Sequence, residues 1–314
     1  MAPIPPPVLA PLPRTVTPFP GETTDSYLTR LAHANRLSPR ALRSHIAGRW
    51  DRTPPFPVGR LATATGLPAS TLRHAIPDLG FGYGALHHNP PNSAGFPQRK
   101  ADDGPPCTMC ALARGITLPV RCWKHPEDVI CPRHHRWTGP GSAASQPGLS
   151  AQPAILQAHK RHLRLARRLG RDPVALAFAV ADHICRHWHG LRQHDAAFRD
   201  RMLAFHGPGW QPSPASPTTA AATYPQAVAL TRLLATPHWR ALSASSQPGH
   251  REAFISELRR TVAPGYRWPQ PRRPADPLET WINERYLPGW SPHLFSYHSW
   301  PPPVTPEARD TTVG

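Results

Sequence analysis

Lysines and acids are both scarce in this sequence. Only Lys100, Lys124 and Lys160 are lysines, and 36 Lys and Arg residues face 19 Asp and Glu, which gives a formal net charge of +17. The preference for arginine, with abundant alanine and proline, is typical of a GC-rich genome, but that bias does not explain the shortage of acids. The charge balance therefore predicts a polyanionic partner, most simply double-stranded DNA.

Long apolar runs are missing as well. The sequence has no apolar stretch of about 18 residues, the length that a membrane-spanning helix needs. The start "MAPIPPPVLAPLPR" has neither the basic beginning nor the uninterrupted apolar segment of a signal peptide. We therefore expect no membrane partner and a cytoplasmic location. Cysteines are few, five in all, and in a reducing compartment their spacing indicates metal or redox chemistry rather than disulfides.

Common catalytic motifs are also absent: no Walker lysine loop, no GxSxG and no dinucleotide fingerprint occurs. A transposase-like nuclease needs several carboxylates around two metal ions, and the few acids here fit loop or helix surfaces. The stretch "DHI" at 182–184 resembles the signature of HNH nucleases, but it lies inside a helical pattern. We predict that the chain is not an enzyme and has no small-molecule substrate.

Alternating patterns typical of long strands are absent too, whereas helical periodicity is frequent. We predict a mainly α fold with an N-terminal helix-turn-helix repeat, a central zinc-ribbon-like module and a helical C-terminal half. A Pro- and Ala-rich stretch at 207–222 is expected to interrupt that half as a linker. The expected parts are a Pro-rich segment (1–20), the tandem repeat (21–80), a zinc-binding module (81–140), a linker (141–153), a helical domain (154–300) and a disordered tail (301–314).

An internal repeat relates "RLAHANRLSPRALRSHI" (30–46) to "RLATATGLPASTLRHAI" (60–76) at an offset of thirty residues. Each copy predicts a helix, a short turn and a second helix. Gly66 suits the left-handed residue that ends a helix, and Leu67 suits the elbow between two helices. The pattern favours a helix-turn-helix, although a plain αα-hairpin needs the same residues. Eight of the seventeen positions are identical: Arg30/Arg60, Leu31/Leu61, Ala32/Ala62, Ala34/Ala64, Leu37/Leu67, Leu42/Leu72, Arg43/Arg73 and Ile46/Ile76.

Two basic surfaces are candidates for DNA contact. Arg40, Arg43, Arg73 and His74 lie on the second helices of the two copies, where a helix-turn-helix protein contacts the major groove. An ordinary solvated face is the alternative. Further along, Lys160, Arg164, Arg167, Arg168 and Arg171 recur at helical spacing. For Arg164, Arg167 and Arg168 we expect contacts to DNA phosphates, which give affinity without sequence choice.

Cysteine and histidine spacing predicts a metal site. Cys107-x2-Cys110 is followed, after a gap of twenty residues, by Cys131-x2-His134. Three thiolates and one imidazole in closely spaced pairs suit a structural Zn²⁺ ion with tetrahedral geometry. Cys122-x2-His125 is a second possible pair, and whether it contributes remains open at this point. Cys185 stands alone on an amphipathic helical pattern, so we expect it in the core.

The order of these features resembles the TniQ family of transposition proteins, which is related to the target-selecting TnsD proteins. The resemblance covers roughly residues 14–140 and rests on "ETTDSYLTRLAHANRLSPRAL", the second copy "LATATGL", the Cys-x2-Cys pair and "VICPRHHRW". It implies DNA binding and a role in guiding a transposase and its AAA+ ATPase to a target. Many members carry a further CPxC after CPRH, and "WTGPGSAASQPG" has none.

Other functions fit parts of the same pattern. A stand-alone transcription regulator uses the same helix-turn-helix, an HNH-like nuclease would use His183, and a zinc-dependent protein-interaction module would need no DNA at all. The resemblance favours an accessory protein of transposition that helps to select the target or to recruit the transposition proteins.

Overall fold

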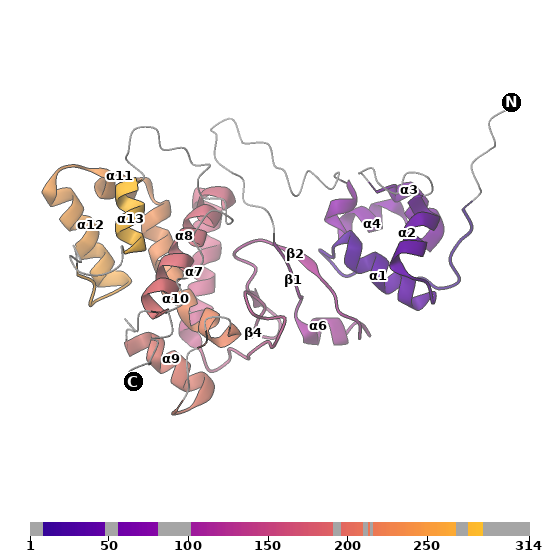
Figure 1. The fold of residues 1–314 in the computed structure, drawn as a ribbon, viewed down its shortest axis with the longest axis horizontal. Coiled ribbons are helices and arrows are strands. Elements are labelled where there is room, and N and C mark those ends of the chain that lie inside the picture. Colours follow the sequence, from indigo (N-terminus) through magenta and orange to yellow (C-terminus); the bar gives the residue numbers. More distant parts are fainter. Residues whose placement is uncertain are drawn as a thin grey trace, which may run out of the picture.

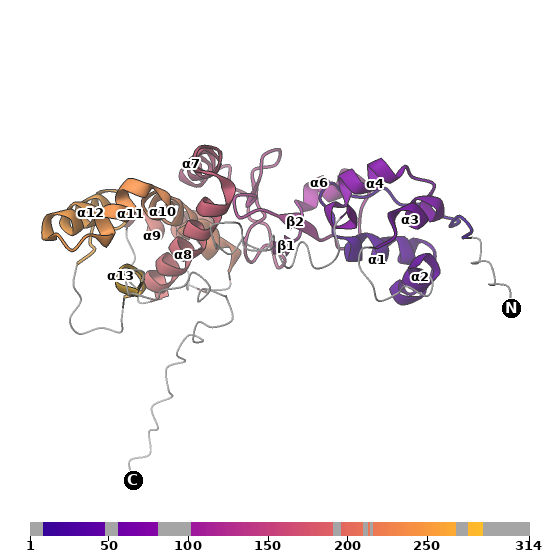
Figure 2. The ribbon, with the colours of Figure 1, turned by 90° about the horizontal axis from the view of Figure 1, so that it is seen from above.

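The computed structural model describes residues 9–47, 56–80, 102–190, 196–209, 213, 216–267 and 276–284. Helices predominate in this part of the chain, and the strands are two short antiparallel pairs. In both views the strands lie between an N-terminal group of helices, α1 to α4, and a larger C-terminal group, α7 to α13 (Figures 1 and 2). The expected tail at 301–314 lies outside the described residues.

The N-terminal group confirms the helices that the repeat predicts. α1 (Thr24–Ala34) and α2 (Pro39–Ala47) form the first copy, and α3 (Val58–Thr65) and α4 (Ala69–Ala75) form the second. Thr23 caps α1 by accepting a hydrogen bond from the Ser26 N–H (3.2 Å). We call residues 21–80 the tandem repeat.

Both copies of the tandem repeat share one apolar core. Leu31 and Leu61 on the first helices are fully buried, and so are the identical leucines and isoleucines of the second helices. The same interior therefore explains why these repeat positions are identical. Leu12 and Val16, from the proline-rich N-terminal segment, pack against this core. The buried set is Tyr27, Leu28, Leu31, Ala32, Leu42, Ile46, Leu61, Ala64, Leu72, Ala75, Ile76 and Leu79.

The central module, residues 102–152, has little regular structure. β1 (Asp102–Gly104) pairs with β2 (Cys122–Lys124), and β3 (Ile130–Cys131) pairs with β4 (Arg136–Trp137). A single short helix, α6 (Thr108–Leu112), lies between the first two strands in the sequence. Residues 141–152, where we expected a linker, form turns that pack back onto the module, and Leu149 among them is fully buried.

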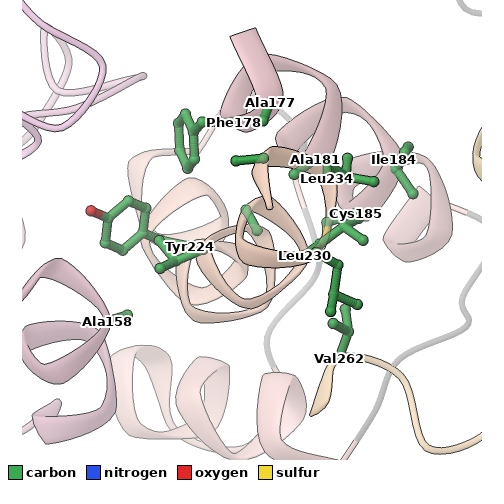
Figure 3. Packing of buried hydrophobic residues seen from close by; sticks show 14 of the residues in the cluster. Ala158, Ala177, Phe178, Ala181, Ile184, Cys185, Tyr224, Leu230, Leu234 and Val262 are labelled. Atoms are coloured by element: carbon green, nitrogen blue, oxygen red, sulfur yellow. The ribbon is translucent and has the colours of Figure 1, made fainter. Parts of the chain in front are cut away.

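The helical half, residues 153–284, packs around α10 (Pro217–Ala235). Almost all residues of α10 are buried. The other elements of the helical half are α7 (Pro153–Leu169), α8 (Arg171–Gly190), α9 (Ala196–His206), α11 (Pro237–Ala244), α12 (Pro248–Thr261) and α13 (Pro277–Glu284). Figure 3 shows Tyr224 and Leu230 of α10 among side chains of α8, where Cys185 is fully buried as expected. None of the described helices combines the length and the apolar character needed to cross a bilayer.

The expected linker at 207–222 is wrong over its second half. Ser216 caps α10 and Pro217 occupies its first turn, so the helix begins well before Tyr224. Pro225 lies inside α10. The run of small residues before it resembles a linker in composition, but in the structure these residues are buried and let neighbouring helices approach α10 closely.

Candidate metal centre and basic surfaces

Four side chains converge in the central module. Cys107 lies directly before α6, Cys110 lies within it, Cys131 ends β3 and His134 lies in the turn before β4. Their ligand atoms all lie within 4.8 Å of one another. The four residues predicted from spacing are therefore brought together, by a short helix on one side and a tight turn on the other.

The distances fit a tetrahedral ion. The Nδ1 atom of His134 is 3.4 Å from Cys107 Sγ, 3.3 Å from Cys110 Sγ and 3.7 Å from Cys131 Sγ. The sulfurs of Cys110 and Cys131 are 3.7 Å apart. Around a tetrahedral Zn²⁺ ion, sulfur ligands are about 3.8 Å apart and sulfur and nitrogen are about 3.5 Å apart. The donor set and its spacing can hold one such metal ion, with every coordination position filled by protein.

Electrostatics also favours a cation between these groups. Burial, followed by the adjacent thiols of Cys131 and Cys107, raises the pKa of Cys110 to about 12. Burial also acts to raise the pKa of Cys131, but backbone N–H groups of His134 and Arg133 point at its sulfur and bring that pKa below its usual value. A bound divalent ion would remove the mutual repulsion of the thiolates and deprotonate all three thiols.

Hydrogen bonds around the cluster hold the ligand loops. The His135 N–H donates to the Cys131 carbonyl (2.9 Å) and closes the turn that carries His134, and His135 itself has a φ of 45°. Gln146 is buried, and its amide binds both the Thr108 N–H (2.9 Å) and the Pro106 carbonyl (2.7 Å). Gln146 thus fixes the loop before α6. Because Gln146 lies about forty residues from that loop in the sequence, no sequence pattern indicated this role.

The second possible ligand pair lies elsewhere. Cys122 is buried with Phe19 and Val120, and burial, followed by the nearby carboxylate of Glu22, raises its pKa to about 12. His125 is exposed, and its Nε2 lies 2.9 Å from Arg171 Nη1. Within the described residues, the group that could hold a metal ion contains neither of them. The structure therefore brings the first four residues together and leaves Cys122 and His125 outside that group.

A buried ion pair lies where the tandem repeat meets the central module, and sequence reasoning missed it. Arg30 Nη2 is 2.6 Å from Glu22 Oε2, and the two side chains are 5% and 0% exposed. Glu22 also accepts hydrogen bonds from the Phe19 N–H and the Ser26 hydroxyl (2.8 Å each) and forms a β-bridge with Cys122. Glu22 and Arg30 both lie in the quoted "ETTDSYLTR" motif, which was the available signal.

The candidate DNA residues of the tandem repeat differ in their surroundings. Arg40, Arg73 and His74 are exposed on α2 and α4. Arg43 is half-buried, forms an ion pair with Asp25 of α1 and lies over the Phe56 ring, 6.0 Å from its centroid. Arg43 therefore already has a structural role, and a DNA phosphate would have to compete with Asp25 for the Arg43 guanidinium.

The basic residues of α7 are all exposed, whereas the opposite face of the helix packs into the helical half. Arg171 is different, because it starts α8 and binds the buried Glu127 (3.1 Å). The stretch that resembled an HNH signature also has a structural explanation, since Asp182 pairs with Arg186 one turn later in α8 (2.8 Å).

Comparison with known proteins gives one match. Residues 13–137 match the TniQ family model, which spans the tandem repeat and the metal ligands and ends where β4 ends. The comparisons with curated proteins and with solved structures gave no match.

Proposed function

Because residues 13–137 are a TniQ domain, a domain associated with target selection in transposition, we propose that this chain is a zinc-containing, DNA-binding accessory protein of a transposition system. It acts without a catalytic centre of its own. It helps to select the target or to recruit the transposase and its AAA+ ATPase. The family match carries this proposal, and the geometry of the four ligands and the excess of basic charge support it.

Zn²⁺ is the metal we propose for Cys107, Cys110, Cys131 and His134. Three thiolates and an imidazole are soft ligands that suit Zn²⁺, and a site closed by four protein ligands is structural rather than catalytic. The central module buries few apolar side chains near these ligands, so metal binding would supply much of its folding free energy.

Duplex DNA is the partner we propose for the tandem repeat. Arg40, Arg73 and His74 are exposed on second helices, where a helix-turn-helix protein would present them to the major groove. Arg43 would hold α2 in place through its ion pair with Asp25 of α1, close to the surface that would face the DNA.

The test combines DNA binding with partner binding. Fluorescence anisotropy of the full chain on labelled duplex, in about 0.15 M salt, should show binding that the variant Arg40→Gln/Arg73→Gln weakens about 10- to 100-fold, since each basic contact to DNA is worth about one power of ten at this salt. The control variant Arg259→Gln/Arg260→Gln removes the same charge from α12. In a pull-down, the full chain should also associate with an AAA+ ATPase.

The outcomes separate the candidate functions. DNA binding together with ATPase association supports the transposition role. DNA binding without ATPase association would instead favour the stand-alone transcription regulator. ATPase association without any affinity for duplex would favour the protein-interaction module. If neither partner binds, the proposal is wrong.

A further inference from the structure

α7 carries an unusually one-sided set of charges. Its seventeen residues include five cations and no acid, and all five cations are exposed. At 3.6 residues per turn they fall within a sector of roughly 120°. The opposite side of the helix buries Ile155, Ala158, His162 and Ala166 in the helical half. In Figure 2, α7 lies at the margin of the helical half. Because all five cations are exposed, the charged sector faces solvent. The five cations, which we call the α7 basic face, are Lys160, Arg161, Arg164, Arg167 and Arg168.

The α7 basic face has no acidic partner within the part of the chain that the structure describes. Arg164 and Arg167 instead donate from Nε to backbone carbonyls of their own helix, Lys160 O (3.2 Å) and Leu163 O (3.3 Å). Their outer guanidinium nitrogens remain available. Helix carbonyls are weak partners for a guanidinium, whereas the planar guanidinium fits phosphate well.

α12 provides the comparison that decides between genome bias and function. Arg259 of α12 pairs with Glu252 (2.9 Å) and Arg260 pairs with Glu257 (2.7 Å). An arginine-rich composition alone would supply arginines to both α7 and α12. It does not explain why acidic residues accompany the arginines of α12 and are absent from α7. Like charges at the spacings of Lys160/Arg164, Arg164/Arg167 and Arg164/Arg168 destabilise a helix. An uncompensated set of this kind indicates a bound polyanion.

We propose that the α7 basic face binds the phosphate backbone of duplex DNA, and this rests on the proposed function above. It deepens that function by adding a second contact, which lies outside residues 13–137 and reads no sequence. The tandem repeat would then contact base edges, while α7 would hold the adjoining backbone and increase affinity for any duplex. A long footprint with little sequence preference at one end follows from this arrangement.

The experiment compares Arg164→Gln/Arg168→Gln with Arg259→Gln/Arg260→Gln in the full chain. Gln is a good helix former, so neither variant should unfold its helix. For the α7 variant we expect the slope of log K against log salt to fall by about 2, and affinity at about 0.1 M salt to fall about 10- to 100-fold, equally for specific and random duplex. Its melting temperature should stay the same or rise, because like charges are removed. The control should keep the wild-type salt slope.

Several results would overturn the assignment. If the two variants have equal salt slopes, the α7 basic face does not contact DNA, even if Arg40→Gln/Arg73→Gln still weakens binding and the proposed function survives. If wild-type protein binds no duplex, both proposals fail together. If the α7 variant loses affinity only for an RNA duplex of the same length, or only for vesicles of anionic phospholipid, the partner is not DNA.

Discussion

The tandem repeat and the central module reach a fixed structure in different ways. The tandem repeat buries a continuous apolar core that both of its copies share. The central module has only a small cluster within the described residues, Val120 and Cys122, which pack with Phe19 of the N-terminal segment, and the rest of its buried apolar side chains pack against the helical half. Val129, Ile130 and Trp137 belong to the core of the helical half, where Trp137 meets Tyr224 edge to face at 5.4 Å.

This difference gives a physical reason for a metal ion at the proposed site. The central module touches the tandem repeat through Glu22, Thr23 and Arg121, and touches the helical half through Glu127 and Trp137. A segment that joins two larger bodies has little interior left for itself. Four ligands on one ion can fix its loops without an apolar core.

The largest expected effect comes from breaking the metal site. Cys107→Ser should abolish metal binding and unfold the central module, because structural Zn²⁺ contributes about 10 kcal/mol or more in small zinc modules at pH 7. Circular dichroism should still show most of the helices, since the tandem repeat has its own core. Metal content and limited proteolysis within residues 102–152 are the measurements.

Cys122→Ser is the matched control for this experiment, because Cys122 is equally buried but lies outside the ligand cluster. It should retain one ion per chain. Metal loss in both variants would show that the ligand assignment is wrong.

The buried ion pair should give the next largest effect. Arg30→Met leaves the Glu22 carboxylate buried without its cation, which costs about 3–5 kcal/mol of unfolding free energy. Arg43→Met removes the solvated pair with Asp25 by the same substitution and should cost about 0–1 kcal/mol. Urea unfolding curves of the two variants measure the difference. Equal costs would mean that Glu22 is not held in the buried position described here.

The helical half should show a pH dependence near pH 6. Burial lowers the pKa of His159 from its usual value, although Asp128 acts in the opposite direction. The folded state therefore disfavours the protonated ring. Stability is unaffected well above the usual pKa of about 6.5 and falls as the pH drops below it. His159→Gln should flatten this part of the profile of unfolding free energy between about pH 7 and pH 5. An unchanged profile would contradict the burial assigned to this ring.

The smallest expected effect distinguishes the two copies of the repeat. Arg36 (φ 57°) occupies the position that corresponds to Gly66 (φ 69°), and both end the first helix of their copy in the left-handed region. Arg36→Gly should stabilise the protein by about 0.5–1 kcal/mol, because a residue with a Cβ is strained there. Gly66→Ala should destabilise it by a similar amount. Thermal melting of the two variants would show opposite shifts, and shifts of the same sign would refute the equivalence of the turns.

The sequence predicted those features that depend on local spacing. The thirty-residue offset identified Leu31, Leu61 and Gly66 in the roles that the structure confirms, because helical periodicity and a left-handed turn are local properties. For the same reason, the ligand spacing identified the four side chains that the structure brings together in one cluster. Features that depend on contacts distant in sequence could not be read from it. Gln146 reaches back to Thr108, and the early start of α10 depends on its burial among other helices.

The ligand shell of the bound metal tests the central claim most directly. X-ray absorption at the zinc edge of the purified full chain should show one ion per chain with three sulfurs at about 2.3 Å and one nitrogen at about 2.0 Å. A shell with fewer than three sulfurs would contradict the proposed centre, and so would a metal-free chain whose central module is fully folded.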